Sequence, residues 1–202
     1  MNWIKGISSQ LNKVDRVNHK IPRYWLALSA RPYDGVNSEE YQAELARSQE
    51  QGVEPPVAPD CEYLQVVYDG IPAIALLPNI LEKLQSDYDK SDEVNYFNFN
   101  GEKAWFDKNM RLGLVRDVEI AKSNAQATYR LWVNNNDYLV TVNYLEQFLK
   151  ELEVYAVGVN NTTQQHIKEI RQLNGKEEIL AYRVDTNYPP AITFDMSKVV
   201  AE

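Results

Sequence analysis

The chain is poor in the residues that carry the commonest metal and thiol chemistry. It has one cysteine, Cys61, and two histidines, His19 and His166, among 202 residues. A single cysteine cannot form a disulfide within the chain, and such a composition is typical of reducing compartments. Paired cysteines and histidines at i, i+4 spacing, the usual zinc-binding patterns, do not occur. We therefore expect an inert thiol and no metal site.

Glycine is also scarce, with eight residues and no cluster of them. This excludes the glycine-rich loops that bind phosphates, and no serine nucleophile elbow is present either. Carboxylates are plentiful, and four lie close together at Asp87, Asp89, Asp92 and Glu93. Their spacing does not match a calcium-binding loop, which favours a solvated acidic loop. We expect no catalytic residue, no cofactor and no enzymatic activity.

Long apolar runs are absent as well. The longest spans residues 71–77, which is far too short to cross a bilayer. The first residues lack a basic start followed by an apolar stretch, so no signal peptide is predicted. We expect a protein made in the cytoplasm, without a membrane partner.

Charge is distributed unevenly along the chain. Residues 1–32 carry a net charge of +5, whereas the remaining 170 residues carry −13. An acidic body argues against general binding of nucleic acid. The basic N-terminal part favours contact with an acidic protein surface over contact with DNA, and a solvated helix face is the simpler alternative.

The first 60 residues are expected to form an N-terminal arm. Apolar residues at helical spacing in 3–17 predict an amphipathic helix, and residues 24–30 predict a strand. Residues 38–51 read as a polar helix that is capped by Ser38 and ended by Gly52. The next nine residues, 52–60, hold three prolines and predict an extended linker.

The rest of the chain alternates between strand and helix patterns. Residues 62–69 and 71–77 predict strands, and a short helix is expected over 79–87. The Asn100-Gly101 turn predicts a hairpin across 94–106. Asp107 then caps a helix that runs to about Lys122, with a buried stripe of Met110, Leu114, Val118 and Ala121.

A second hairpin is expected at 128–142, with its turn in residues 134–137. The helix after it has a long apolar stripe, and a third helix is expected over 163–173, capped by Asn161 or Thr162 and closed by Gly175. A short helix at 176–182 leads to a final strand at 191–194. The stripe of the longer helix consists of Leu145, Phe148, Leu149, Leu152, Tyr155, Ala156 and Val159.

These patterns together predict an α+β fold. Two β-hairpins pack on three to four helices, preceded by an N-terminal amphipathic helical arm and an extended proline-rich linker. We expect two parts, an arm at 1–60 for docking or oligomerisation and a compact domain at 61–202. Trp105 and Trp132 lie on the two hairpins; they are expected to anchor the hairpins, and the alternative is an exposed stacking surface for a base or a sugar. Arg111 is expected to pair with Asp107.

The order of motifs in residues 94–194 resembles a domain of unknown function that recurs in tail-fibre and other structural proteins of tailed phages and prophages. The resemblance rests on segments such as FNFNGEKAWFDKNMRLGLV and EILAYRVDTNYPPAITF. The matching positions are Trp105, Phe106, Asp107, Arg111, Leu131, Trp132, Leu152, Tyr155, Ala156, His166, Ile170, Tyr188 and Pro189.

The resemblance implies a structural virion protein, assembled in the host bacterial cytoplasm, whose partners are other fibre, tail or capsid proteins. It also implies a homo-oligomer, and a trimer is expected for a fibre component. A fibre-assembly chaperone that is absent from the mature particle is the alternative, and an enzyme that acts on surface sugar ranks last. The interface residues expected in the docking arm are Trp3, Ile7, Leu11, Val14, Arg16 and Arg23.

Overall fold

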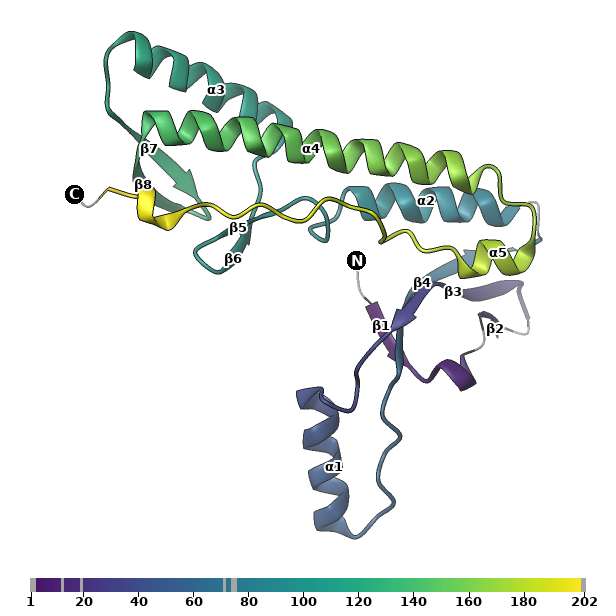
Figure 1. Cartoon of the computed structure of the whole chain (residues 1–202). Helices are drawn as coiled ribbons and strands as arrows, with labels where there is room; N and C mark the ends of the chain where they lie inside the picture. The colour runs from purple at the N-terminus through teal and green to yellow at the C-terminus, as the bar shows by residue number, and fades with distance from the viewer. Residues whose placement is uncertain (1–2, 12, 19, 71, 74–75, 201–202) are drawn as a thin grey trace. The chain divides into compact units, whose positions relative to one another are not determined.

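The computed structural model describes residues 3–11, 13–18, 20–70, 72–73 and 76–200. It contains both helices and small antiparallel sheets, which confirms the α+β class (Figure 1). The chain divides into two compact units. We call Met1–Tyr88 with His166–Thr186 the sheet unit, and Asp89–Gln165 with Asn187–Glu202 the hairpin unit. This division does not follow the expected boundary at residue 60.

The sheet unit is built on four antiparallel strands in the order β1-β4-β3-β2. They are β1 (Trp3–Gly6), β2 (Val14–Asn18), β3 (Arg23–Pro32) and β4 (Cys61–Asp69). A 3-10 turn, η1 (Ser8–Gln10), joins the first two. The predicted strands at 24–30 and 62–69 are confirmed.

The amphipathic helix predicted over 3–17 is wrong. Trp3 lies opposite Leu64 of β4, and Val14 lies opposite Leu26 of β3. A short isolated helix is only marginally stable. The outer edges of the β3–β4 pair, by contrast, present unpaired backbone N–H and C=O groups to which a further strand can bond. Long-range strand pairing therefore overrides the helical spacing of the apolar residues.

Alternation along β3 and β4 places Leu26, Leu28 and Leu64 on one buried face. The helix α5 (Lys176–Ala181) contacts β3, and Leu84 of α2 (Leu77–Asp89) is buried and lines one hollow together with Leu64 of β4. The helix predicted at 79–87 is confirmed and is longer than expected. Of the strand predicted at 71–77, residues 72–73 have no regular structure and Leu77 begins α2, while residues 71 and 74–75 lie outside the described residues.

The proline-rich segment 52–60 is irregular, as predicted, but it does not lead to a separate domain. The helix before it, α1 (Glu39–Gln51), is capped by Ser38, whose Oγ accepts from Tyr41 N at 3.3 Å, and ends at Gly52 with φ of 64°. The segment then runs back to β4, and Gly35 N donates to Pro59 O at 3.1 Å. A Cβ at Gly35 would lie 2.0 Å from that oxygen, so only glycine permits this approach.

The hairpin unit contains both predicted hairpins. The first is β5 (Phe97–Phe99) with β6 (Glu102–Ala104), and the second is β7 (Thr128–Val133) with β8 (Asn136–Thr141). Both two-residue turns have positive φ at each central residue, Asn100-Gly101 at 50° and 83° and Asn134-Asn135 at 49° and 66°. Asparagine and glycine tolerate this conformation best, which is why the turns were predictable.

Two helices complete the hairpin unit, α3 (Lys108–Ser123) and most of α4 (Val142–Ile170). Asp107 caps α3, since its Oδ1 accepts from Met110 N at 2.8 Å. The predicted buried stripe of α3 is correct at Leu114, Val118 and Ala121, but Met110 is 40% exposed and Arg111 is buried instead. Arg111 donates to Glu153 and to the Phe106 carbonyl oxygen, each at 2.8 Å, rather than pairing with Asp107 as expected.

The helix α4 is continuous, so the separate helix predicted at 163–173 is wrong. Thr163 is buried, and its hydroxyl bonds to Asp89 and lies 3.1 Å from the Tyr188 hydroxyl. The Thr163 hydroxyl therefore has hydrogen-bond partners inside a continuous helix, whereas the sequence suggested a helix cap at this point. Gly175, predicted to close that helix, is instead the N-cap of α5. The predicted apolar stripe is confirmed, with six residues buried and Ala156 half-buried.

Aromatic rings form the core of the hairpin unit. Phe148 lies 5.1 Å from Phe97 and 4.9 Å from Phe194 between ring centroids, and Phe99 lies 4.8 Å from Phe194. The final segment makes one parallel bridge, between Asn98 and Thr193, instead of the predicted strand. It still delivers Phe194 to the centre of the cluster.

Candidate functional site

The residues expected in a docking arm belong to the folded sheet. Trp3 and Val14 are half-buried on β1 and β2, and Ile7 and Leu11 are half-buried on either side of η1. The two arginines are exposed. Arg16 Nε donates to Asn18 O at 3.1 Å, and Arg23 makes two hydrogen bonds to Asp69, at 2.5 and 3.1 Å. The six residues are therefore parts of one sheet and its loops, and not one face of a helix.

The sheet has a second face, opposite to the buried leucines. Trp25 and Ala27 of β3 point to this side, as do Tyr63 and Gln65 of β4. A hollow of about 330 Å³ lies over it, and its lining also includes Ile7, Leu11 and Asp15. Two of the six predicted docking residues therefore help to form a surface depression.

Beside the hollow lies a pair of exposed apolar side chains. Trp25 and Val67 are direct cross-strand partners and are 41% and 55% exposed. We call this pair, together with Ile7 and Leu11 of the hollow, the open face. Sequence reasoning missed Trp25 and Val67, although the alternation within YWLALSA signals a face that carries Trp25.

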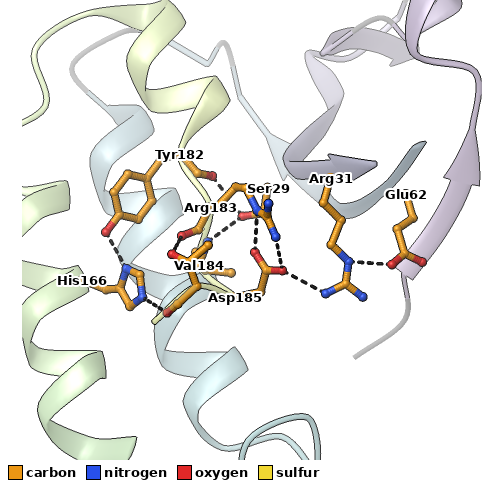
Figure 2. Close-up of polar contacts among 9 residues, drawn as sticks. Ser29, Arg31, Glu62, His166, Tyr182, Arg183, Val184 and Asp185 are labelled. Carbon is orange, nitrogen blue, oxygen red and sulfur yellow. Dashed lines mark hydrogen bonds and ion pairs between the residues drawn. The ribbon is translucent and has the colours of Figure 1, made fainter. Parts of the chain in front are cut away.

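The buried face of the sheet holds an ion cluster (Figure 2). The Asp185 side chain is only 2% exposed and accepts from Arg31 Nη1 at 2.9 Å and from Arg183 at 2.8 and 3.0 Å. Arg31 Nε also donates to Glu62 Oε1 at 2.5 Å. The Arg31 guanidinium lies 3.7 Å from the ring centroid of Trp3. Trp3 is thus a structural partner of this cluster and not a free docking residue.

A bulge in β3 completes the link between sheet and C-terminal segment. The register shifts between Leu28 and Arg31, and Ser29 adopts a φ of 55°. Its hydroxyl donates to Tyr182 O and accepts from Val184 N, both at 3.1 Å (Figure 2). The bulge thereby turns a polar side chain inward, where it satisfies the backbone of the segment that carries Asp185.

Charges in the cluster are mutually stabilised. Burial alone would raise the pKa of Asp185, but hydrogen bonds from Arg183 and Arg31 outweigh it and hold the pKa below its ordinary value. Burial likewise opposes the charge of Arg31, and its bonds to Asp185 and Glu62 nevertheless raise its pKa. Asp185 and Arg31 therefore hold each other in the charged form, and their ion pair clamps the segment 182–186 to the sheet.

His166 is held in a hydrogen-bonded chain. Its side chain is buried, with Nδ1 2.5 Å from the Tyr182 hydroxyl and Nε2 2.8 Å from Thr186 O. The Tyr182 hydroxyl donates to Glu169 at 2.7 Å. Both ring nitrogens have protein partners, so the imidazole helps to fix the segment 182–186.

The Cys61 thiol is buried, and this burial raises its pKa. Within the described part of the chain, no three His, Cys, Asp or Glu side chains are grouped as metal ligands would be. No helix among these residues has the length and apolar character needed to span a membrane.

Of the two hairpin tryptophans, only one fits the expected anchoring role. Trp105 is half-buried, and its ring lies 6.2 Å from that of Tyr155 in an edge-on arrangement. Trp132 is 56% exposed, so the expectation that it anchors its hairpin is wrong.

Comparison with known proteins gives no relatives: no family model, no curated protein and no solved structure matches the chain.

Proposed function

We propose that this protein is a structural component of a tailed-phage virion, a fibre, tail or head-attachment protein that docks on other virion proteins through its open face. Two things support the proposal. One is the resemblance of residues 94–194 to a domain of phage structural proteins. The other is the presence of the open face on a unit whose opposite face is already covered.

The observation that carries the docking role is the exposed Trp25–Val67 pair. The two side chains are neighbours across the β3–β4 ladder, and a hollow lined by Ile7 and Leu11 lies next to them. Tryptophan is enriched among the residues that dominate binding energy, especially beside pockets that a partner can fill. The open face therefore has the anchor and the depression of a protein interface.

The basic character of residues 1–32 contributes less to docking than the sequence suggested. Lys5 is paired inside the unit with Glu40, Arg23 with Asp69, and Arg31 with Glu62 and Asp185. These pairs reduce the field that an acidic partner would meet. We therefore assign docking to apolar contact and not to charge.

The test is incorporation into particles. Quantitative mass spectrometry of purified particles from the encoding phage should find the chain at a fixed copy number relative to the major capsid protein. The double variant Trp25→Ala/Val67→Ser should remain folded and soluble but be depleted from particles. Trp132→Ala, which removes a more exposed indole from the other unit, is the matched control and should be incorporated normally.

Two outcomes would overturn the proposal in different ways. Normal incorporation of the double variant would remove the docking role of the open face. Absence of the unaltered chain from particles, together with abundance in infected lysate, would replace the virion component with the fibre-assembly chaperone.

A further inference from the structure

Trp132 is placed outward by the alternation of its strand. Its neighbours Leu131 and Val133 point inward and are 0% and 2% exposed, whereas Trp132 is 56% exposed. Single exposed apolar residues are common and need no explanation by themselves. What distinguishes Trp132 is the depression that it borders.

A hollow of about 290 Å³ lies between the two hairpins of the hairpin unit. Trp132 and Asn134-Asn135 line it from the second hairpin, and Trp105 lines it from the end of β6, with Met110 of α3 beside them. Ala104, Phe106 and Val133 complete the lining. None of these eight side chains is charged. The hollow therefore combines aromatic surface with amide groups and has no fixed charge.

The walls of the hollow are held in place before any ligand arrives. Asn134 Nδ2 donates to Lys103 O at 3.2 Å and lies 3.4 Å from Glu102 Oε2, which fastens the turn of the second hairpin to β6. Trp105 is braced by Tyr155 and by the Arg111 guanidinium, 5.3 Å from its ring centroid. Preformed walls lower the ordering cost of binding.

We propose that this hollow binds a neutral saccharide. A sugar ring has an apolar face of C–H groups, which fits against an indole, and an edge of hydroxyls, which both donate and accept hydrogen bonds. The Asn135 amide offers both a donor and an acceptor, and Asn134, whose Nδ2 is engaged by Lys103 O and Glu102, offers its Oδ1 as an acceptor, so the two side chains match that edge. The volume is near the lower end of the range for ligand pockets, about 300–1,000 Å³, and suits one or two sugar rings.

The uncharged lining favours a saccharide over a nucleic acid as the ligand. Stacking alone would also suit a base, but proteins that hold single strands add cations along the backbone path. No cation lines this hollow. The proposal goes beyond the proposed function, because a docking face on the sheet unit does not require a ligand on the hairpin unit.

The experiment uses the full chain in solution. Methyl glycosides of glucose, galactose, mannose, N-acetylglucosamine and rhamnose are titrated while the indole N–H resonances of the four tryptophans are followed by NMR. At least one glycoside should shift the Trp132 and Trp105 resonances saturably, with a Kd on the order of 1 mM, and leave Trp25 unshifted.

Variants then assign the binding to the proposed walls. Trp132→Ala should weaken binding about tenfold or more, whereas Trp132→Tyr, which keeps an aromatic face, should retain most of it. Asn135→Gly removes the amide, and glycine keeps the positive φ of that position without strain, so binding should weaken while the hairpin persists. Trp25→Ala is the matched control and should bind as the unaltered chain does.

Three results would overturn the proposal: no glycoside shifts the Trp132 resonance, binding survives Trp132→Ala unchanged, or a short thymidine oligonucleotide shifts the resonance where the glycosides do not. The last would indicate a stacking site for bases. Because the readout is binding by the isolated chain, its failure is distinct from a failure of particle incorporation.

Discussion

The sheet unit and the hairpin unit bury different chemistry at their centres. In the sheet unit an almost fully buried carboxylate, Asp185, lies between two arginines and ties the C-terminal segment to the strands. In the hairpin unit the core consists instead of phenylalanine rings, and Phe148 contacts both Phe97 and Phe194. An ion cluster fixes geometry but contributes little net stability, whereas aromatic packing contributes much. The two units should therefore respond differently to mutation and to pH.

The two units also differ in the side chains that surround their exposed tryptophans. Each unit exposes one tryptophan, Trp25 on the sheet unit and Trp132 on the hairpin unit. Trp25 lies beside the aliphatic Val67, which suits an apolar protein partner. Trp132 lies beside two asparagines, which suit a hydroxylated ligand. One residue type thus serves two kinds of recognition, and its neighbours decide which.

The largest effect is expected from the core of the hairpin unit. Phe148→Ala removes a ring that is 1% exposed and in edge contact with Phe97 and Phe194. The free energy of unfolding should fall by about 4 kcal/mol. Urea denaturation followed by circular dichroism measures it, and Phe148→Leu, which refills part of the volume, should lose clearly less. Equal losses for the two variants would show that the ring packing is not what holds this core.

A smaller loss is expected from the ion cluster of the sheet unit. Asp185→Asn keeps the shape but removes the charge that Arg31 and Arg183 share. Loss of one partner of a buried pair costs about 3–5 kcal/mol, and we expect about 2 kcal/mol because both guanidiniums also reach solvent. Urea denaturation compares it with Glu153→Gln, which removes the exposed carboxylate that pairs with Arg111 in the hairpin unit. A loss for Asp185→Asn no greater than for that control would contradict the prediction.

The same cluster gives the sheet unit a pH dependence. The pKa of Asp185 in the folded chain lies below its ordinary value of 3.8, so the folded state favours the charged carboxylate. Its contribution to stability is complete above that ordinary pKa and is lost as the pH falls below it, through the folded-state pKa. Denaturation at a series of pH values should show a decline below about pH 4 that is smaller in Asp185→Asn. Identical acid profiles would show that Asp185 does not contribute.

The sequence predicted the hairpins and the strands β3 and β4 correctly but missed β1 and β2, for opposite physical reasons. Asn100-Gly101 and Asn134-Asn135 act locally, because positive φ restricts which residues a tight turn accepts. The strand β1 pairs with β4, 55 to 61 residues further along the chain, and β2 pairs with β3, 5 to 12 residues further along, while the apolar spacing at 3, 7, 11 and 14 imitates a helix. The spacing within residues 3–17 alone cannot show that β4 and β3 would supply these partners.

The candidate sites were predictable only in part. Ile7 and Leu11 were chosen for a helical stripe and nevertheless line the hollow of the open face. Trp3 was chosen for the same reason, yet it lies against Arg31 in the covered cluster. The exposure of Trp132 was missed because burial averages favour an anchored indole, while the pleat of β7 turns this one outward. Which side of a sheet a residue faces depends on register, which composition does not reveal.

Helix caps offer a finer comparison of the units. Ser38 caps α1, which has no buried residue, and Asp107 caps α3, which buries Leu114 and Val118. Asp107→Ala should lower the global stability by about 1 kcal/mol, whereas Ser38→Ala should only increase fraying of α1. Urea denaturation measures the first, and hydrogen exchange of the α1 amides measures the second. A global loss for Ser38→Ala as large as for Asp107→Ala would mean that α1 is coupled to the core of its unit.

The smallest change in stability, and the sharpest separation of the units, is expected from the two exposed tryptophans. Trp25→Ala and Trp132→Ala should each change the free energy of unfolding by no more than about 0.5–1 kcal/mol, since the two residues are 41% and 56% exposed in the folded chain. Thermal denaturation provides the measurement. With stability preserved, the loss of particle incorporation in Trp25→Ala/Val67→Ser and the loss of glycoside binding in Trp132→Ala can be attributed to the surfaces themselves. A stability loss well beyond 1 kcal/mol in either single variant would instead place that indole in the packing of its unit and remove it as a recognition residue.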